Sequence, residues 1–567
     1  NMNIQDADIT STISLNGKYG RVFDGKSFHD VNRPLRHSNI IPPQNLADDA
    51  QSKSSIFVSI PQFRDGKRCA RTLHRLFSLA AHSDRIYVGL IEQTNVESKE
   101  DDPTCLIEYC ALLGYKMKVH EAGIAHKSER QADYDDVMEN CPRAMNQIRS
   151  VRFHSLSAKG PVYARSFIRK LLGNEEFCMQ IDAATDFAQG WDKLAVEQWM
   201  KTGNEYAVLS NVPQSEKDKN KNLSNMEVPR QCSIKIGSEG VPLFEIPADG
   251  KAIGLKQPLL ATSYSPSFAF AKCHYETNVP HDPFAVQLLE TEKFPRFARL
   301  WTRGYDVYTP SLNIVYKDTS VLHPLHHTAG HGDSGEKKWP KNDSERKQAH
   351  IRMKVLLDIH HGITSAEASM LGGSGGNSIG GKISTARANL GIYGLGKRRT
   401  LSQLLEFTGI ALPSSDFTGQ HGNGGNSCSN PEWVPYDASI SPRANLYDGT
   451  GKADDLDLDP EFPLRTLRPD ATGGQYDHPF AMGNAAWEEM TIAQKANADG
   501  SSHDASSDVP YSFIFLLWTV GLCTWYGMYV GGGSSASKTK KGVGKQQARS
   551  LAKKARPLAE RTMLKNV

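Results

Sequence analysis

The segment from Lys159 to Asp192 reads KGPVYARSFIRKLLGNEEFCMQIDAATDFAQGWD, and it decides the fold. Its first part, residues 159–172, has apolar positions at helical spacing and a proline near the first turn. The part from Phe177 to Asp182, FCMQID, is an apolar run that stops on an acid, which is typical of a buried strand. We therefore expect a helix followed by a buried strand.

The same alternation continues on both sides of this segment. Upstream, SIFVSI (55–60) is typical of a buried strand, a helical stretch covers 68–82, and RIYVGLI (85–91) is a second strand. Downstream, EYAVLS (205–210) is typical of another strand, and a helix is expected over 284–305. Alternating strands and helices predict an α/β fold in which helices cover both faces of one sheet.

Length and charge bound the functions that remain. With 567 residues and 39% hydrophobic content, the chain can bury a sizeable core, which excludes a small disulfide-stapled scaffold. It has 66 Lys and Arg against 63 Asp and Glu, a net charge of +3. This balance excludes a chain that binds nucleic acid through phosphate contacts along its whole length, so we expect no nucleic-acid partner.

The C-terminal part of the chain predicts a membrane anchor. Residues 509–530, VPYSFIFLLWTVGLCTWYGMYV, carry no charge, and at about 1.5 Å per residue they just span a hydrocarbon core of roughly 30 Å. Residues 531–567 hold ten Lys or Arg and one Glu, a net charge of +9. The positive-inside rule places this basic tail in the cytosol and the bulk of the chain in the lumen of the Golgi or the endoplasmic reticulum.

The lumenal orientation calls for an N-terminal signal; the alternative is a tail anchor with the bulk of the chain in the cytosol. We expect a polar leader at 1–53, one domain at 54–412, and a flexible stalk at 413–508 that is rich in Gly, Ser, Asn, Asp and Pro. The nine cysteines form no C-x-x-C motif, which argues against a structural zinc. In a lumen some of them can pair, and Cys105 or Cys110 with Cys141 are among the alternatives.

Asp182 is the first candidate for chemistry. Open α/β sheets bind ligands in the crevice outside the carboxyl ends of their strands, which is where this acid lies. A nucleotide diphosphate held there needs its charge offset, and Asp182 and Asp186 offer oxygen ligands for a divalent cation. The alternative is that Asp182 merely caps the following helix.

Several longer stretches resemble one known family. They are, in chain order, IFVSIPQFRD, RIYVGLIEQ, GPVYAR, MQIDAATDF with GWD, PSFAFAKCHYETNVPHDP, ARLWTRGYDVYTP and YGLGKRRTLSQLLEFTGIAL. Together they cover about Ser54 to Leu412 and resemble the GlcNAc-transferring glycosyltransferases, typified by the cytoplasmic transferase that modifies hydroxyproline on the Skp1 ubiquitin-ligase subunit. The resemblance implies a GT-A-like mixed sheet flanked by helices, a UDP-GlcNAc donor, a Ser, Thr or hydroxyproline hydroxyl on a polypeptide or glycoprotein acceptor, and transfer with retention.

The resemblance also implies a divalent cation, Mn²⁺ or Mg²⁺, although the chain departs from the family pattern. Asp182 matches the acid that reaches the metal-bound diphosphate, but Ala184 and Lys317 stand where the family has histidines. His323, or another histidine of HPLHHTAGH, could supply the missing imidazole. Alternatively, Lys317 could neutralise the diphosphate without a metal, as a point charge.

The matched blocks carry further expectations. Arg165 is expected beside the nucleotide crevice, and Asp65, after the first strand, is a candidate for uridine or ribose contact. Glu290 and Glu292 stand where the family has an acidic pair close to the acceptor, with a solvated helix face as the alternative.

Trp301 and Arg303 could floor the sugar pocket, although Trp301 also suits the core. The rival from another class of function is a membrane-tethered module that binds a sugar nucleotide or a glycoprotein and has lost catalysis, because Ala184 and Lys317 replace expected ligands.

Overall fold

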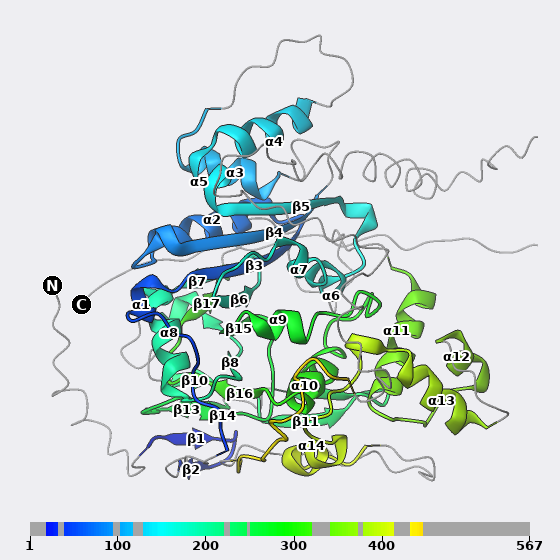
Figure 1. The fold of residues 1–567 in the computed structure, drawn as a ribbon. Coiled ribbons are helices and arrows are strands. Elements are labelled where there is room, and N and C mark those ends of the chain that lie inside the picture. The colour runs from blue at the N-terminus through cyan, green and yellow to red at the C-terminus, as the bar shows by residue number, and fades with distance from the viewer. Residues whose placement is uncertain are drawn as a thin grey trace, which may run out of the picture. The chain divides into compact units, whose positions relative to one another are not determined.

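A computed structural model describes residues 19–31, 39–94, 103–116, 129–219, 227–245, 250–319, 341–371, 378–412 and 431–445 of the chain. Its centre is an eight-stranded mixed sheet, in which β3, β4, β5 and β6 are parallel and β15 runs against its two neighbours. In spatial order the strands are β14 (Leu259–Leu260), β16 (Asp306–Thr309), β8 (Ala207–Ser210), β15 (Phe268–Lys272), β6 (Phe177–Ile181), β3 (Ile56–Phe63), β4 (Ile86–Thr94) and β5 (Ile148–His154) (Figure 1). The predicted α/β sheet flanked by helices is confirmed.

Strand β3 shows why the sheet needs helices on both faces. Successive side chains of a strand point to opposite faces, and here both sets are apolar. Ile56, Val58 and Ile60 lie in one core, whereas Phe57 lies in the other. No face of this strand is left for water, so the buried strands predicted at 55–60, 85–91 and 177–182 are confirmed as β3, β4 and β6.

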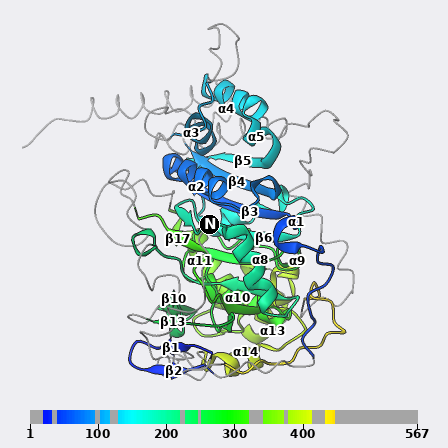
Figure 2. The same cartoon turned by 90° about the vertical axis from the view of Figure 1, so that its left-hand side faces the viewer.

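Two sets of helices supply the two cores. The face that receives Ile56 is covered by α1 (Ala50–Lys53), α2 (Gly66–Ser78), α3 (Cys105–Leu112), α4 (Glu129–Asn140), α5 (Pro142–Gln147) and α8 (Trp191–Lys201). The face that receives Phe57 is covered by α6 (Pro161–Arg165), α7 (Ile168–Leu171), α9 (His274–Asn278), α10 (Lys293–Thr302), α11 (Asp343–Leu356), α12 (Ser365–Met370), α13 (Ile379–Ala388) and α14 (Leu401–Thr408). Figure 2 looks at the side that carries α1 and α8.

The helix predicted over 284–305 was wrong in its first half. Helix α10 begins only at Lys293. Before it, Gln287 has a φ of 60°, a left-handed conformation that no helix accepts, and its backbone N–H donates to the carbonyl oxygen of Lys159 at 2.6 Å. The segment predicted as one helix over 159–172 is likewise two short helices, α6 and α7.

Disulfides join elements of both faces. Cys69–Cys105 links α2 to α3, Cys110–Cys141 links α3 to the residue before α5, and Cys178–Cys273 joins β6 to the residue after β15. Of the alternatives left open by the sequence, Cys110 is therefore the partner of Cys141.

The leader predicted at 1–53 is in part a piece of the fold. Residues 21–23 form a strand that pairs with residues 251–253, because Val22 fills a small third core with Ala252. The four-stranded sheet so formed consists of β10 (Glu227–Pro229), β13 (Lys251–Ile253), β1 (Arg21–Phe23) and β2 (Phe28–Asp30). A two-stranded sheet consists of β11 (Ser233–Ile236) and β12 (Pro242–Glu245), and its Ile234 and Phe244 belong to the core that also holds Phe57.

The stalk predicted at 413–508 also begins too early. Residues 431–445 pack on the domain, and a buried carboxylate holds them there. Asp306 accepts the indole N–H of Trp433 at 2.8 Å, and the guanidinium of Arg399 lies 2.8 Å from its other oxygen. All three side chains are buried, so this stretch belongs to the folded domain.

The predicted membrane span at 509–530 and the basic tail at 531–567 lie outside the described residues. Within the part of the chain that the structure describes, every helix is too short or too polar to cross a membrane.

Candidate active site

The candidate site is the edge of the main sheet at which β3, β4 and β6 end. These strands are parallel and in register, so their carboxyl ends meet at one edge. Asp182 follows the last residue of β6, and Oδ1 of its carboxylate lies 2.9 Å from Nη2 of Arg165, which comes from the C-terminus of α6. The Arg165 side chain is 6% exposed and that of Asp182 is 47% exposed. The pair therefore presents a carboxylate to solvent on top of a buried guanidinium.

One hydroxyl group on α2 fixes the turn that follows Asp182. Thr72 is buried, and its Oγ1 lies 2.8 Å from the carbonyl oxygen of Ala183 and 2.9 Å from that of Thr185. The same oxygen accepts the backbone N–H of Thr185 at 3.0 Å. The Thr185 hydroxyl in turn donates to the carbonyl oxygen of Asp182 at 2.7 Å. The direction of the Asp182 side chain is thus set by a fully bonded backbone.

Lys317 reaches the same edge from a second, three-stranded sheet. This sheet consists of β7 (Thr185–Phe187), β17 (Val315–Lys317) and β9 (Gln214–Ser215). Lys317 is the register partner of Thr185, and paired residues of antiparallel strands project on the same face. The next backbone N–H, of Asp318, donates to the carbonyl oxygen of Ala184 at 2.9 Å. Lys317 is exposed, and it shares a face with the residue that holds the Asp182 carbonyl.

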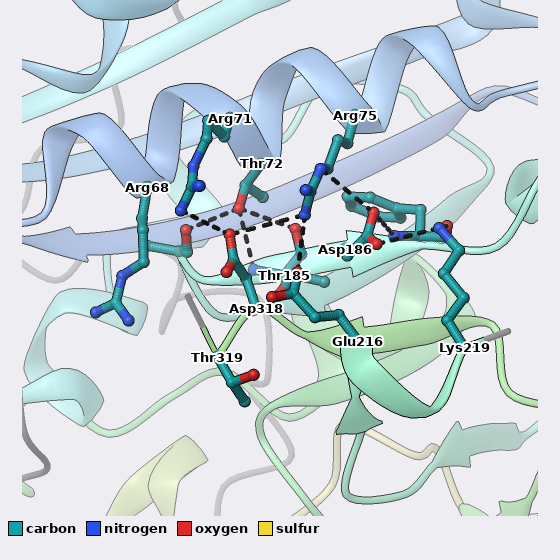
Figure 3. A network of polar contacts seen from close by, with 12 residues as sticks. Arg68, Arg71, Thr72, Arg75, Thr185, Asp186, Glu216, Lys219, Asp318 and Thr319 are labelled. Carbon is teal, nitrogen blue, oxygen red and sulfur yellow. Dashed lines mark hydrogen bonds and ion pairs between the residues drawn. The ribbon is translucent and has the colours of Figure 1, made fainter. Parts of the chain in front are cut away.

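A network of charges braces this turn against α2 (Figure 3). Arg71 and Arg75 point from the helix toward Asp318, with nitrogen–oxygen distances of 2.9 and 3.7 Å. Arg75 also lies 3.2 Å from Glu216 and 3.7 Å from Asp186. Because Asp186 lies in β7 and Asp318 follows β17, the network ties both strands to one helix.

Asp186 does not join Asp182. In β7 it is the neighbour of Thr185 and therefore points to the opposite face, where its carboxylate meets Arg75 and accepts from Nζ of Lys219 at 3.1 Å. The expectation that Asp186 shares a metal with Asp182 was wrong for this reason. The sequence alone could not decide the face, since it depends on a strand of three residues.

The described residues at this edge do not fit a divalent cation. Asp182 offers one carboxylate that is already paired with Arg165, the side chain of Ala184 has no ligand atom, and Lys317 carries a positive charge. Mg²⁺ and Mn²⁺ need several oxygen or imidazole ligands, and no three His, Cys, Asp or Glu residues of the described ranges gather into such a group. His323 lies outside the described residues.

The predicted acidic pair is split. Glu290 is exposed, and its carboxylate lies 2.6 Å from Nζ of Lys293. Glu292 is buried at the N-terminus of α10, and burial raises its pKa to about 7, against the opposing effect of Arg296 and Arg165. Glu292 therefore belongs to a buried group of charges that includes Arg165 and Arg296, whereas Glu290 faces solvent.

Trp301 and Arg303 do not floor a pocket. Trp301 is 1% exposed and stacks on Phe407 of α14, and Arg303 is fully buried and donates to the carbonyl oxygen of Ile392 at 2.8 Å. Both side chains hold α10 against the C-terminal part of the domain. The sugar contacts expected of these two residues were wrong, and the alternative that Trp301 belongs to the core is confirmed.

Asp65 lies at the same edge as Asp182, before α2, but its carboxylate lies 2.6 Å from Nη2 of Arg68 one turn later. It stays a candidate for contact with a nucleoside.

Two site residues were not predicted. The first is Thr72, which no chemical motif in the sequence singles out. His281 is buried, and its Nε2–H donates to Oε1 of Gln180 at 2.7 Å, two residues before Asp182. Burial lowers the pKa of His281 well below its ordinary value, so the imidazole is neutral. The only available signal was the H-D-P triplet at 281–283.

The known proteins to which this chain is similar are glycosyltransferases. A family model described as "Glycosyltransferase (GlcNAc)" matches residues 55–413. No curated protein matches the chain. Among solved structures, GalNAc-T7 with UDP, GalNAc and Mn²⁺ is 12% identical to this chain, with a TM-score of 0.38. The match covers 63% of this chain and 57% of the GalNAc-T7 chain. The mannosyltransferase PcManGT from Pyrobaculum calidifontis with GDP-Man and Mn²⁺ is also 12% identical to this chain, with a TM-score of 0.29. That match covers 61% of this chain and 77% of the PcManGT chain. Similarities of this size carry no information on activity.

Proposed function

The chain belongs to the family of GlcNAc glycosyltransferases, and from this we propose that it moves N-acetylglucosamine from UDP-GlcNAc to a Ser, Thr or hydroxyproline hydroxyl of a polypeptide, with retention. The observation that carries the proposal is the Asp182–Arg165 pair at the edge where the parallel strands β3, β4 and β6 end. Ligands of open α/β sheets bind at such an edge. The GT-A fold type is part of this proposal.

The role of each residue at this edge follows from its burial. Asp182 presents an exposed oxygen to the donor, and Arg165 and the Thr72-bonded turn hold that oxygen in place. Such preorganisation is what positions a donor sugar against an acceptor. No dedicated base is required, since the leaving phosphate oxygen can take the acceptor proton. Glu290, the exposed member of the acidic pair, is the remaining candidate on the acceptor side.

The test is a transfer assay on the full chain. UDP-GlcNAc, UDP-GalNAc and UDP-Glc are offered with peptides containing Thr, Ser or hydroxyproline, and products are identified by mass spectrometry and by the NMR coupling of the anomeric proton. We expect transfer from UDP-GlcNAc with the α configuration, and a loss of ~10²-fold or more in Asp182→Asn. Binding of UDP-GlcNAc without transfer to any peptide would instead support the non-catalytic module.

We also propose that the domain faces the lumen of the Golgi or the endoplasmic reticulum, anchored by residues 509–530 with a cytosolic tail. The three disulfides of the described ranges support this, because such bonds persist in oxidising compartments. In sealed microsomes, added protease should remove an epitope placed after Val567 and spare one near Asn342. Loss of both epitopes would show a cytosol-facing, tail-anchored enzyme.

A further inference from the structure

The charges around the candidate site are almost all matched. In the network of Figure 3, the cations Arg71, Arg75 and Lys219 face the carboxylates of Asp318, Glu216 and Asp186. Each of these side chains is at least two-thirds buried, and Asp318 is 1% exposed. The network therefore contributes rigidity to the edge and no surplus charge.

Two further basic side chains of the described residues, Arg165 and Lys317, lie near Asp182. Arg165 is matched by Asp182 at 2.9 Å. Lys317 adds a further positive charge, and its side chain projects on the face of Thr185, beside the turn that carries Asp182. Asp318, the next residue, cannot match it, because it projects to the other face and is held by Arg71. Among the described residues of this turn, the exposed Lys317 therefore supplies a surplus positive charge that neither Asp182 nor Asp318 matches.

This surplus has the sign and place that a nucleoside diphosphate requires. We propose that Lys317 neutralises the diphosphate of the donor in the position that a divalent cation would otherwise take. The inference rests on the proposed function and names the group that performs one part of it. It follows from the donor set, since one paired carboxylate and an ammonium group suit a phosphate and repel a metal ion.

The proton and electron balance of the transfer does not need a metal either. The bond between the sugar C1 and the phosphate oxygen breaks, and its electron pair stays on the diphosphate. The acceptor oxygen forms the new bond to C1, and its proton passes to the leaving phosphate oxygen. Lys317 stays protonated throughout and stabilises the charge that develops on the diphosphate.

The experiment measures UDP binding by isothermal titration, so that it does not depend on an acceptor. Full-length protein is titrated with UDP in EDTA and in Mn²⁺. We expect the two dissociation constants to agree within about threefold. Lys317→Ala should weaken binding by about tenfold or more in both buffers, whereas Lys317→Arg, which keeps the charge, should stay within about threefold. Lys201→Ala, an exposed lysine of α8 paired only with Glu197, is the matched control and should bind as wild type does.

Each other outcome overturns the inference. UDP binding that is lost in EDTA shows that a metal is required, whether or not Lys317→Ala also weakens it, and leaves the proposed function intact. Binding that is unchanged in Lys317→Ala shows that the lysine is not used. Absence of UDP binding in both buffers overturns the inference together with the proposed function. Thermal unfolding of Lys317→Ala separates loss of binding from loss of fold, and the exposed position predicts an unchanged transition.

Discussion

The Thr72 hydroxyl group is the contact on which the geometry of Asp182 depends, and replacing it tests the site most directly. Thr72→Val keeps the shape and the β-branched side chain, so helix α2 should be little affected. It removes the only atom that bonds the Ala183 and Thr185 backbone from this helix. Thr72→Ser is the matched control, because it keeps the hydroxyl and removes only a methyl group.

The magnitude follows from what each variant leaves unpaired. In Thr72→Val the N–H of Thr185 and one carbonyl oxygen lose their partner in a buried place, at about 1–3 kcal/mol each. In Thr72→Ser the lost methyl group costs about 1 kcal/mol. We therefore expect the free energy of unfolding to fall by about 3 kcal/mol in the valine variant and by about 1 kcal/mol in the serine variant.

Urea denaturation followed by tryptophan fluorescence measures the two values, and titration with UDP measures the consequence for the site. The valine variant should bind UDP more weakly than the serine variant, since it frees the turn that carries Asp182. If valine is as stable as serine and binds UDP equally well, the turn is held by other contacts and the argument from Thr72 is refuted.

Three further results are expected. Burial raises the pKa of Glu292 from 4.5 to about 7, so between these pH values the folded state keeps a proton that the unfolded chain releases. The free energy of unfolding, measured by urea titration, should therefore fall by about 3 kcal/mol from the lower to the higher pH, and Glu292→Gln should flatten that slope. Parallel wild-type and variant profiles would contradict this. Replacing Cys178 and Cys273 together by Ala should lower the free energy of unfolding by about 4 kcal/mol. Dithiothreitol should then destabilise the variant less than it destabilises wild type, and an equal effect on both proteins would contradict this. Trp433→Phe should cost about 1–3 kcal/mol in thermal unfolding, because the buried Asp306 carboxylate loses one of its donors and keeps Arg399 and Asn204, with UDP affinity unchanged. An unaltered transition would show that residues 431–445 do not stabilise the domain.

The sequence predicted the parts of the fold in which one segment decides its own structure. Strand β3 is apolar on both faces, so its burial did not depend on knowing its partners. The helix predicted over 284–305 failed because apolar spacing also occurs in the irregular stretch before Lys293, where a backbone bond from Gln287 to Lys159 overrides local preference. That bond joins residues far apart in the chain, and no local pattern contains it.

Among the site residues too, the sequence predicted those whose position depends on a single segment and missed those whose position depends on distant contacts. Asp182 could be predicted because a strand end is visible in the sequence, and its place beside Arg165 agrees with that expectation. Asp186 could not, because the face on which it lies is set by the register of β7 against β17. For Trp301 the sequence left the pocket and the core open, and packing on α14, about a hundred residues later, decides for the core.

The disulfides have a consequence for the order in which the protein is made. Cys69–Cys105 and Cys110–Cys141 follow one another along the chain without nesting, and all four cysteines precede β6. In a chain that enters an oxidising lumen from its N-terminus, helices α2, α3 and α5 can be covalently joined while the rest is still on the ribosome. Helix α2, which carries Thr72, is then already held in place when the turn that carries Asp182 is synthesised and packs against it.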